Sequence, residues 1–298
     1  MNRPQSDENG APRLLERVRR AIRVAHLSLR TEKAYLHWIR RYILHHGKRH
    51  PQELGEAEIS AFLSHLAVER QVSASTQNQA LSALLFLYRT VLGRELGRFP
   101  DYARPKRRRK PPVVLTQEEV RQILSCAVGT DKLFLTLLYG TGMRLQEGLR
   151  LRVKDVDFAC NQITVRDGKG KKDRVTMLPE SLKTGLQEHL RRVRELHERD
   201  VAEGYGRVHL PDALAVKYPG APLEWGWQYV FPADERSEDP RGGGKGLRHH
   251  AHERRIQRVF KMAVRRAGMT KLATIHTLRH YAESRIMPSS RSECPSTA

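Results

Sequence analysis

Residues 133–157 read LFLTLLYGTGMRLQEGLRLRVKDVD. The apolar run at the start of this stretch, residues 133–139, predicts a buried helix. Gly140 and Gly142 follow it, and because glycine weakens helices we expect a break there and a second helix from near Met143. The stretch therefore predicts two helices joined by a tight turn.

Arg144 emerges at this expected turn, beside the core, where its guanidinium could be held toward a ligand. Glu147 lies one helical turn later and could brace it. An isolated arginine after a turn is more often an ordinary surface residue. The motif therefore gains weight only in company with others.

The segment that follows, residues 162–178, reads QITVRDGKGKKDRVTML and alternates apolar with polar residues on both sides of a Gly/Lys/Asp turn. This period of two predicts a β-hairpin. It is not a phosphate-binding P-loop, because the pattern G-x-x-x-x-G-K-[ST] does not occur. The basic residues near its tip, which could reach a bound phosphate backbone, are Lys169, Lys171, Lys172 and Arg174.

The first part of the chain, residues 14–97, has helical periodicity. In TEKAYLHWIRRYILHH, residues 31–46, aromatic and aliphatic side chains recur at helical spacing behind Thr31, which could cap the helix. Further helices are expected over residues 56–69 and 75–92. This pattern predicts a small helical bundle with the aromatic stripe in its core.

Between the two halves, residues 104–112 read RPKRRRKPP, in which six of the first seven residues are basic. Flanking prolines and like-charge repulsion favour an extended linker that would lie along a phosphate backbone. A solvated charge run or a targeting signal is the alternative. A second domain is then expected from Thr116, where T-Q-E-E forms a capping box. The basic residues of the linker are Arg104, Lys106, Arg107, Arg108, Arg109 and Lys110.

The composition points to a polyanionic partner. The 298 residues carry a formal net charge of +21 and have a pI near 10.4, and nucleic acid would relieve such self-repulsion. A merely basic protein, or one that binds an anionic membrane surface, is the alternative. The N-terminus lacks a signal-peptide core, and no apolar run would span a bilayer. Three scattered cysteines without a C-x-x-C pair favour free thiols and a cytoplasmic location.

Near the end of the chain, residues 276–280 read HTLRH. His276 and Arg279 are three residues apart and would share a helix face, so that an imidazole and a guanidinium could point at one phosphate. His276 and His280 could instead bind zinc. We disfavour zinc because the sequence has no H-E-x-x-H glutamate and no acidic cluster to complete the site.

Together these segments resemble the tyrosine recombinase family of phage-type integrases. In that family Y-G-T-G-M-R, a hairpin lysine as in G-K-G-K-K-D-R, and H-T-L-R-H occur in this order. More narrowly, the chain resembles an integron integrase. The specific likenesses are SLRTEKAYLHWIRRYILHHGKRHP, residues 28–51, and an inserted stretch, LPDALAVKYPGAPLEWGWQYVFPADE, residues 210–235. The resemblance covers residues 14–280.

The resemblance implies a mainly α fold with a small antiparallel β-sheet. It implies an N-terminal helical, SAM-like core-binding domain over residues 1–97, a basic linker over 98–115 and a catalytic domain over 116–280. The tail, residues 281–298, does not match the family and is expected to be disordered. Members of the family assemble as tetramers on DNA and need neither metal nor cofactor, so none is expected here.

By the same resemblance, Arg144 and Arg279 would contact the scissile phosphate and stabilise the extra charge of a pentacoordinate transition state. Lys169 matches the family lysine that protonates the leaving 5′ oxygen. His276 matches a histidine that assists proton transfer and phosphate binding.

The resemblance to integron integrases implies that the inserted stretch helps to grip bases that are extruded from a folded single-stranded hairpin substrate. Trp225, Trp227 and Tyr229 are the aromatic residues that could stack on such bases. These side chains could equally belong to the core.

The family's nucleophilic tyrosine lies beyond H-x-x-R and after an L-G-H motif, and neither follows His280 here. Tyr281 is only two residues from Arg279, so on a helix it would project in a roughly opposite direction and would not replace that nucleophile. The resemblance thus implies a C-terminally truncated recombinase, as after a frameshift. It would be catalytically defective, would still bind DNA, and would assemble less readily into a tetramer.

Three other functions stay open at this stage. A non-catalytic, sequence-specific DNA-binding protein would share every residue named above. A metal-dependent nuclease would use His276, His280 and a carboxylate such as Glu283, and a chelator would inhibit it. A basic RNA-binding protein is the third, although the sequence contains no recognised RNA module.

Overall fold

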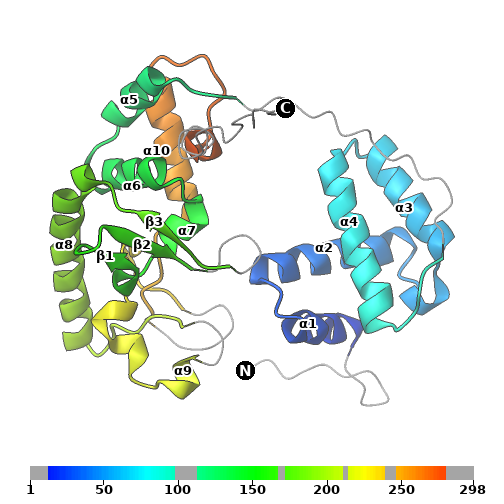
Figure 1. Cartoon of the computed structure of the whole chain (residues 1–298). Coiled ribbons are helices and arrows are strands. Elements are labelled where there is room, and N and C mark those ends of the chain that lie inside the picture. Colours follow the sequence, from blue (N-terminus) through cyan, green and yellow to red (C-terminus); the bar gives the residue numbers. More distant parts are fainter. Residues whose placement is uncertain (1–12, 98–112, 167–171, 211–213, 239–245, 280–298) are drawn as a thin grey trace, which may run out of the picture. The chain divides into compact units, whose positions relative to one another are not determined.

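The computed structural model describes residues 13–97, 113–166, 172–210, 214–238 and 246–279. The chain divides into two compact units, Met1–Lys110 and Pro111–Ala298, and each has its own hydrophobic core (Figure 1). The fold is mainly α-helical with one small antiparallel sheet, so the predicted fold class is confirmed. The expected linker contacts at residues 104–110 and the tail at 281–298 lie outside the described residues.

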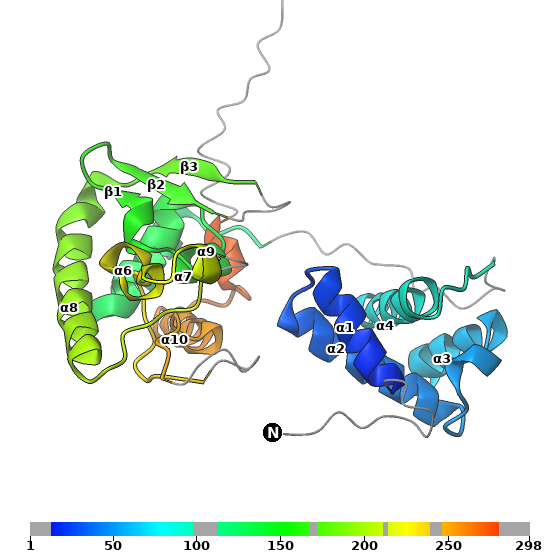
Figure 2. The same cartoon turned by 90° about the horizontal axis from the view of Figure 1, so that it is seen from below.

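The first unit is a helical bundle in which α2 packs against both α1 and α4, and α3 packs against α4 (Figures 1 and 2). Its core is built from apolar side chains on all four helices. A single π-helical turn, η2, continues α4. The elements are α1 (Leu14–Val24), α2 (Leu29–His45), the 3-10 turn η1 (Pro51–Glu53), α3 (Glu56–Val68), α4 (Ala74–Phe86) and η2 (Leu87–Val91).

The predicted start of α2 is wrong by three residues. Thr31 does not cap this helix; Ser28 does, since its hydroxyl accepts the backbone N–H of Thr31 at 3.1 Å. A serine three residues before an N–H is the usual capping geometry, and the S-L-R-T sequence offered it. The aromatic stripe does enter the core, with Trp38 5% exposed and Tyr42 fully buried.

Tyr42 and Tyr88 provide a test of this core. Both are fully buried, their hydroxyl oxygens lie 2.9 Å apart, and burial raises the pKa of both phenols. Tyr42→Phe is expected to lower the free energy of unfolding by about 1–2 kcal/mol, because it leaves the Tyr88 hydroxyl buried without this hydrogen bond. Urea denaturation checks the value. A Tyr42→Phe/Tyr88→Phe variant that lost the full sum of the two single effects would contradict the explanation.

The second unit places a three-stranded sheet beside a set of helices, with α10 packed against α5, α6 and α7 (Figure 1). Residues 275–279 add a final described turn of helix. The α-helices are α5 (Gln117–Ser125), α6 (Gly129–Thr141), α7 (Leu145–Leu149), α8 (Lys183–Ala202), α9 (Leu214–Lys217) and α10 (Glu253–Arg266). The strands are β1 (Val156–Asp157), β2 (Gln162–Val165) and β3 (Arg174–Met177). The 3-10 turns are η3 (Val153–Asp155), η4 (Glu180–Leu182), η5 (Ala221–Leu223) and η6 (Trp225–Trp227).

The start of α5 agrees with the sequence prediction. The Thr116 hydroxyl accepts the backbone N–H of Glu119 at 3.2 Å, and the Glu119 carboxylate accepts that of Thr116 at 2.7 Å. Because the two bonds are reciprocal, they satisfy two N–H groups that the first helical turn would leave unpaired. The predicted capping box is confirmed.

The turn between α6 and α7 differs in detail from the prediction. The helix does not break at Gly140; it runs through this residue and ends at Gly142, whose φ of +63° is left-handed. Gly140 is needed for another reason, because a Cβ there would lie 2.7 Å from Cγ of Pro179. Arg144 is the N-cap residue of α7, so that this helix starts at Leu145 rather than near Met143.

Close packing of α6 on α7 predicts a steric effect at Gly148. A Cβ at this position would lie 2.7 Å from Cδ2 of Leu138 and 3.2 Å from the Phe134 ring. Gly148→Ala is therefore expected to lower the free energy of unfolding by about 1–2 kcal/mol. Gly185→Ala in α8 is the matched control: its Cβ would meet only Leu133 at 3.5 Å, and alanine favours a helix, so stability should hold or rise. Equal losses in thermal denaturation would contradict this interpretation.

The predicted hairpin is confirmed, and β1 adds a third strand that was not predicted. Cross-strand pairing places Arg174 opposite Val165 and Thr176 opposite Ile163, on the buried face of the sheet. The apolar residues of β3 face the other way, and Val175 and Met177 are 60% and 74% exposed. The inner face of β3 is therefore polar, and it presents Arg174 to the helices.

Candidate functional site

Arg144 and Glu147 form a closed pair at the start of α7. One carboxylate oxygen of Glu147 accepts the backbone N–H of Arg144 at 2.9 Å, and the other accepts a guanidinium N–H at 2.6 Å. The contact that the spacing predicts between these side chains is confirmed. About a third of the Arg144 side chain remains exposed, so its guanidinium is oriented while still accessible.

Arg174 is the third member of this group, which we call the arginine–glutamate cluster: Arg144, Glu147 and Arg174. Its Nη2 donates to Oε2 of Glu147 at 2.8 Å. From the sequence, Arg174 was expected among the DNA contacts of the hairpin, and its pairing with Glu147 was not predicted. Alternation within β3 could not have revealed it, because the polar residues of this strand face inward, with Arg174 opposite the buried Val165, while Val175 and Met177 are exposed.

The Glu147 carboxylate is ionised although its side chain is only 6% exposed. Burial by itself would raise the pKa of Glu147. The hydrogen bonds from the Arg174 side chain and from the backbone and side chain of Arg144 outweigh burial and lower this pKa to about 2. The cluster therefore carries two positive charges and one negative charge at neutral pH.

The turn of helix at residues 275–279 carries His276 and Arg279. It is capped by a Thr274 backbone N–H that donates to the Thr277 hydroxyl at 2.9 Å. Ile275 and Leu278 belong to the same hydrophobic core as the residues that flank Arg144, whereas His276 is exposed and Arg279 is half-buried. The helix thus anchors its apolar side in that core and leaves the imidazole accessible.

The structure describes one of the three hairpin lysines. Lys172 is exposed, while Lys169 and Lys171 lie outside the described residues. The base of the hairpin is fixed from both sides, because β2 packs in the core and the hydroxyl of Thr176 donates to the Thr141 carbonyl at 3.2 Å. The predicted role of Lys169 therefore stays a prediction.

The inserted stretch has a small core of its own around Tyr229, which is 5% exposed. A buried arginine that the sequence analysis did not single out, Arg152, lies over the Tyr229 ring at 4.4 Å from its centroid and donates to the carbonyls of Trp227 and His209. Tyr229 is thus a core residue. Trp225 and Trp227 are half-buried, and their role in stacking stays a prediction.

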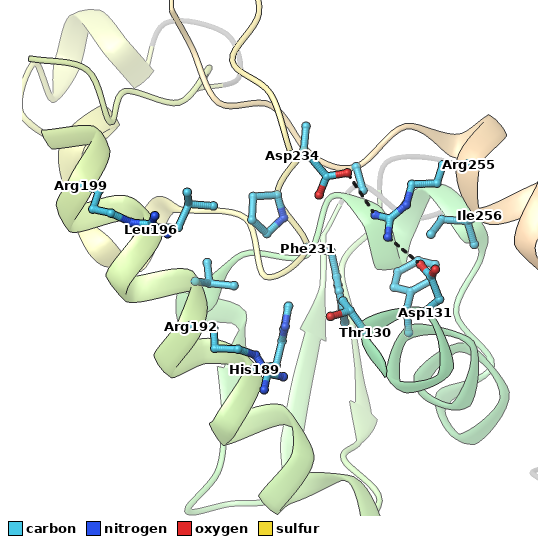
Figure 3. Close-up of a pocket in the computed structure, with 15 residues that line it drawn as sticks. Thr130, Asp131, His189, Arg192, Leu196, Arg199, Phe231, Asp234, Arg255 and Ile256 are labelled. Carbon is cyan, nitrogen blue, oxygen red and sulfur yellow. Dashed lines mark ion pairs between the residues drawn. The ribbon is translucent and has the colours of Figure 1, made fainter. Parts of the chain in front are cut away.

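A cavity of about 250 Å³ lies elsewhere in this unit, between α8 and the first turns of α6 and α10 (Figure 3). Its wall is partly apolar, with Phe134 and Phe231. Its Arg255 is paired with Asp131 at 3.1 Å and with Asp234 at 3.8 Å. Because two carboxylates neutralise this guanidinium, whereas two arginines share one glutamate in the arginine–glutamate cluster, the cluster is a better candidate than Arg255 for binding phosphate.

Other predicted features concern metal, thiols and membrane. The described part of the chain holds no group of three or more His, Cys, Asp or Glu residues arranged for a metal ion. His280, the second histidine of the zinc alternative, lies outside it. Cys126 and Cys160 are free thiols. Within the described ranges, no helix has both the length and the apolar character needed to cross a bilayer.

Comparison with known proteins gives consistent results. The family model for the phage integrase N-terminal SAM-like domain matches residues 14–98, and that for the phage integrase family matches residues 113–291. Proteins described as integrase/recombinase from Escherichia coli and Pseudomonas aeruginosa are each 53% identical over 268 residues, which cover 90% of this chain and 79% of theirs. The tyrosine recombinase XerA of Thermococcus onnurineus is 35% identical over 170 residues, 54% of this chain and 55% of its own length.

Solved structures support the same fold. XerH site-specific recombinase bound to its difH substrate superposes with a TM-score of 0.57 at 18% identity, and covers 96% of this chain and 79% of its own. A lambda integrase tetramer bound to a Holliday junction gives 0.54 at 15% identity, with 90% and 68% coverage. At such identities the likeness concerns the fold alone. The family models and the 53% identical relatives go further, and they show that this chain belongs to the phage integrase family of tyrosine recombinases.

Proposed function

We propose that this chain is a site-specific DNA recombinase in which Arg144 of the arginine–glutamate cluster, His276 and Arg279 receive the scissile phosphate. The observation that carries the proposal is the orientation of Arg144 by a buried, ionised Glu147. A guanidinium that is fixed before substrate binds can stabilise developing negative charge without reorganising during the reaction. Recombinase relatives that are solved on DNA support the choice of substrate.

Each residue has a defined part in the proposed chemistry. Arg144 and Arg279 donate hydrogen bonds to the non-bridging oxygens of the phosphate as it becomes pentacoordinate. His276, exposed at the start of its helix, binds a phosphate oxygen and assists proton transfer. In the family's reaction a tyrosine oxygen attacks the phosphorus as the bond to the 5′ oxygen breaks, and Lys169 would protonate that leaving oxygen. The basic linker at residues 104–110 contacts the DNA backbone on either side of the scissile phosphate.

We further propose an integron recombination site as the substrate, as duplex or as a folded single-stranded hairpin. The inserted stretch at residues 210–235 supports this, because its Trp225 and Trp227 are half-buried aromatic residues of the kind that can stack on bases. Assembly on DNA would be tetrameric, as in the lambda integrase structure. Through its DNA the protein would associate with the nucleoid of a bacterium that carries the mobile genetic element.

We further propose that Tyr281 is not the nucleophile of this reaction. Residues 281–298 contain a single tyrosine, Tyr281, which is two residues from Arg279. On a continued helix these two side chains would point in roughly opposite directions. Tyr281 would therefore not attack the phosphate that Arg279 would hold.

A gel experiment with a nicked suicide duplex that carries an integron site tests the proposal. We expect a retarded band on a native gel, and Tyr281→Phe should leave any protein–DNA band on a denaturing gel unchanged. Equal retardation of a scrambled duplex would contradict site-specific binding. A covalent band that Tyr281→Phe abolishes would contradict the exclusion of Tyr281 as the nucleophile. Strand cleavage without a covalent band, abolished by a chelator, would favour a metal-dependent nuclease instead.

A further inference from the structure

Arg174 lies on β3 with its side chain on the inner face of the sheet, and it reaches the buried oxygen of Glu147 at 2.8 Å. A second bond ties the same strand to the end of α6, between the Thr176 hydroxyl and the Thr141 carbonyl at 3.2 Å. Thr141, at the end of α6, and Arg144, at the start of α7, lie on either side of the turn between these helices. The strand that leads back from the hairpin tip is thus attached at two points to the turn that carries this arginine.

The charges of the cluster give Arg174 a specific effect on Arg144. Glu147 is almost fully buried, so its interaction with a guanidinium is weakly screened by water. If Arg144 were its sole partner, the pair would have no net charge and would attract a phosphate weakly. Arg174 brings the cluster to a net charge of +1, and it occupies Oε2 of Glu147, while the Arg144 guanidinium donates to Oε1.

We propose that Arg174 is a positioning residue, which shares Glu147 with Arg144. The cluster thereby keeps a net positive charge, and Arg144 can bind one phosphate of bound DNA. Arg174 does not itself contact that phosphate. This inference rests on the proposed function, because it takes DNA as the ligand of Arg144. It assigns Arg174 a role different from the direct DNA contact that the sequence suggested.

The test is a double-mutant cycle on DNA binding by the full chain, with the integron-site duplex as probe. Each phosphate contact contributes about 0.9 to the slope of log affinity against log salt concentration. Arg144→Gln and Arg174→Gln are each expected to lower this slope by about one contact and to weaken binding about tenfold at low salt. The double variant should be no worse than either single variant, because both remove the same contact.

Three further variants separate this role from direct contact or misfolding. Adding Glu147→Gln to Arg174→Gln should recover most of the lost slope, since it removes the negative charge that would neutralise Arg144. Arg174→Lys should retain part of the slope. Arg121→Gln in α5, whose partner Glu118 is exposed, is the matched control for losing one arginine, and its effect should add to that of Arg144→Gln. Additive losses for Arg174→Gln and Arg144→Gln, without recovery by Glu147→Gln, would overturn the proposal.

A measurement without DNA keeps the proposed function and this inference apart. In a carbon-13 NMR titration of the Glu147 carboxyl, Arg174→Gln should raise the pKa of Glu147 from about 2. An unchanged pKa would overturn the sharing of Glu147 even if DNA binds. Failure of the wild-type chain to bind any duplex would instead overturn the proposed function, while the titration would still decide whether Glu147 is shared.

Discussion

Replacing Arg248 with methionine is expected to lower the free energy of unfolding of the second unit by about 3–5 kcal/mol. Arg248 donates through Nε and Nη2 to both oxygens of Asp200, and through Nη1 to the carbonyls of Ala233 and Asp234 at 2.8 and 2.9 Å. Asp200 is 4% exposed, so the variant would leave a buried carboxylate without its main partner. Urea denaturation at neutral pH measures the loss.

Two controls and the pH dependence define this effect. Arg194→Met removes an exposed arginine whose partner, Glu198, is also exposed, and it should cost less than about 1 kcal/mol. Adding Asp200→Asn to Arg248→Met should recover part of the loss. Burial raises the pKa of Asp200, but the Arg248 hydrogen bond and charge outweigh burial, and the pKa is lowered from 3.8. The stabilisation is therefore present above pH 3.8 and is lost as pH falls through the lowered pKa; a loss on raising pH would contradict it.

The second large effect is expected for Glu147→Gln, which should destabilise the second unit by about 2–3 kcal/mol at neutral pH. The amide cannot accept from two guanidiniums and a backbone N–H as the carboxylate does, and Arg144 and Arg174 would repel each other. The same variant should widen the range of Arg144 conformations, which nitrogen-15 NMR of the guanidinium would detect as a loss of order.

This loss has a predicted pH profile. The pKa of Glu147 is about 2 in the folded chain and near 4.5 ordinarily, so its stabilisation is complete above 4.5 and disappears as pH falls toward 2. The difference in unfolding free energy between wild type and Glu147→Gln should shrink over that interval. Glu118→Gln, at an exposed pair on α5, is the control and should show little difference at any pH. A difference for Glu147→Gln that stayed constant from neutral pH to pH 3 would contradict the proposed ionisation.

The sequence predicted those features that depend on local periodicity and local hydrogen bonds. The capping box at Thr116, the α2 stripe with Trp38 and Tyr42, and the hairpin all follow from spacing within a few residues. The Arg144 to Glu147 contact also follows, because helix geometry brings residues three apart together. Each of these features depends on residues that lie close together in the chain.

Features that depend on how elements pack could not be predicted in this way. Arg174 and Glu147 are 27 residues apart, and only the orientation of β3 against α7 makes them partners. Alternation in β3 marked a strand, but could not say that its polar parity faces inward. The contacts of Arg152 could not be predicted for the same reason, since its acceptors, the carbonyls of His209 and Trp227, lie 57 and 75 residues further along the chain. Tertiary contacts, rather than local propensity, decide such positions.

The close approach of α6 and α7 also bears on how variation among relatives should be interpreted. A Cβ at position 140 would clash with Pro179, and one at position 148 would clash with Leu138. Gly142 has a left-handed backbone, in which a side chain is strained. Each of the three positions therefore excludes larger residues for steric reasons. In a deep mutational scan these three positions would be as intolerant as Arg144 itself. If these glycines are invariant among relatives, the reason would be packing. Variants that still fold are needed to distinguish such positions from those that are invariant because they take part in the chemistry.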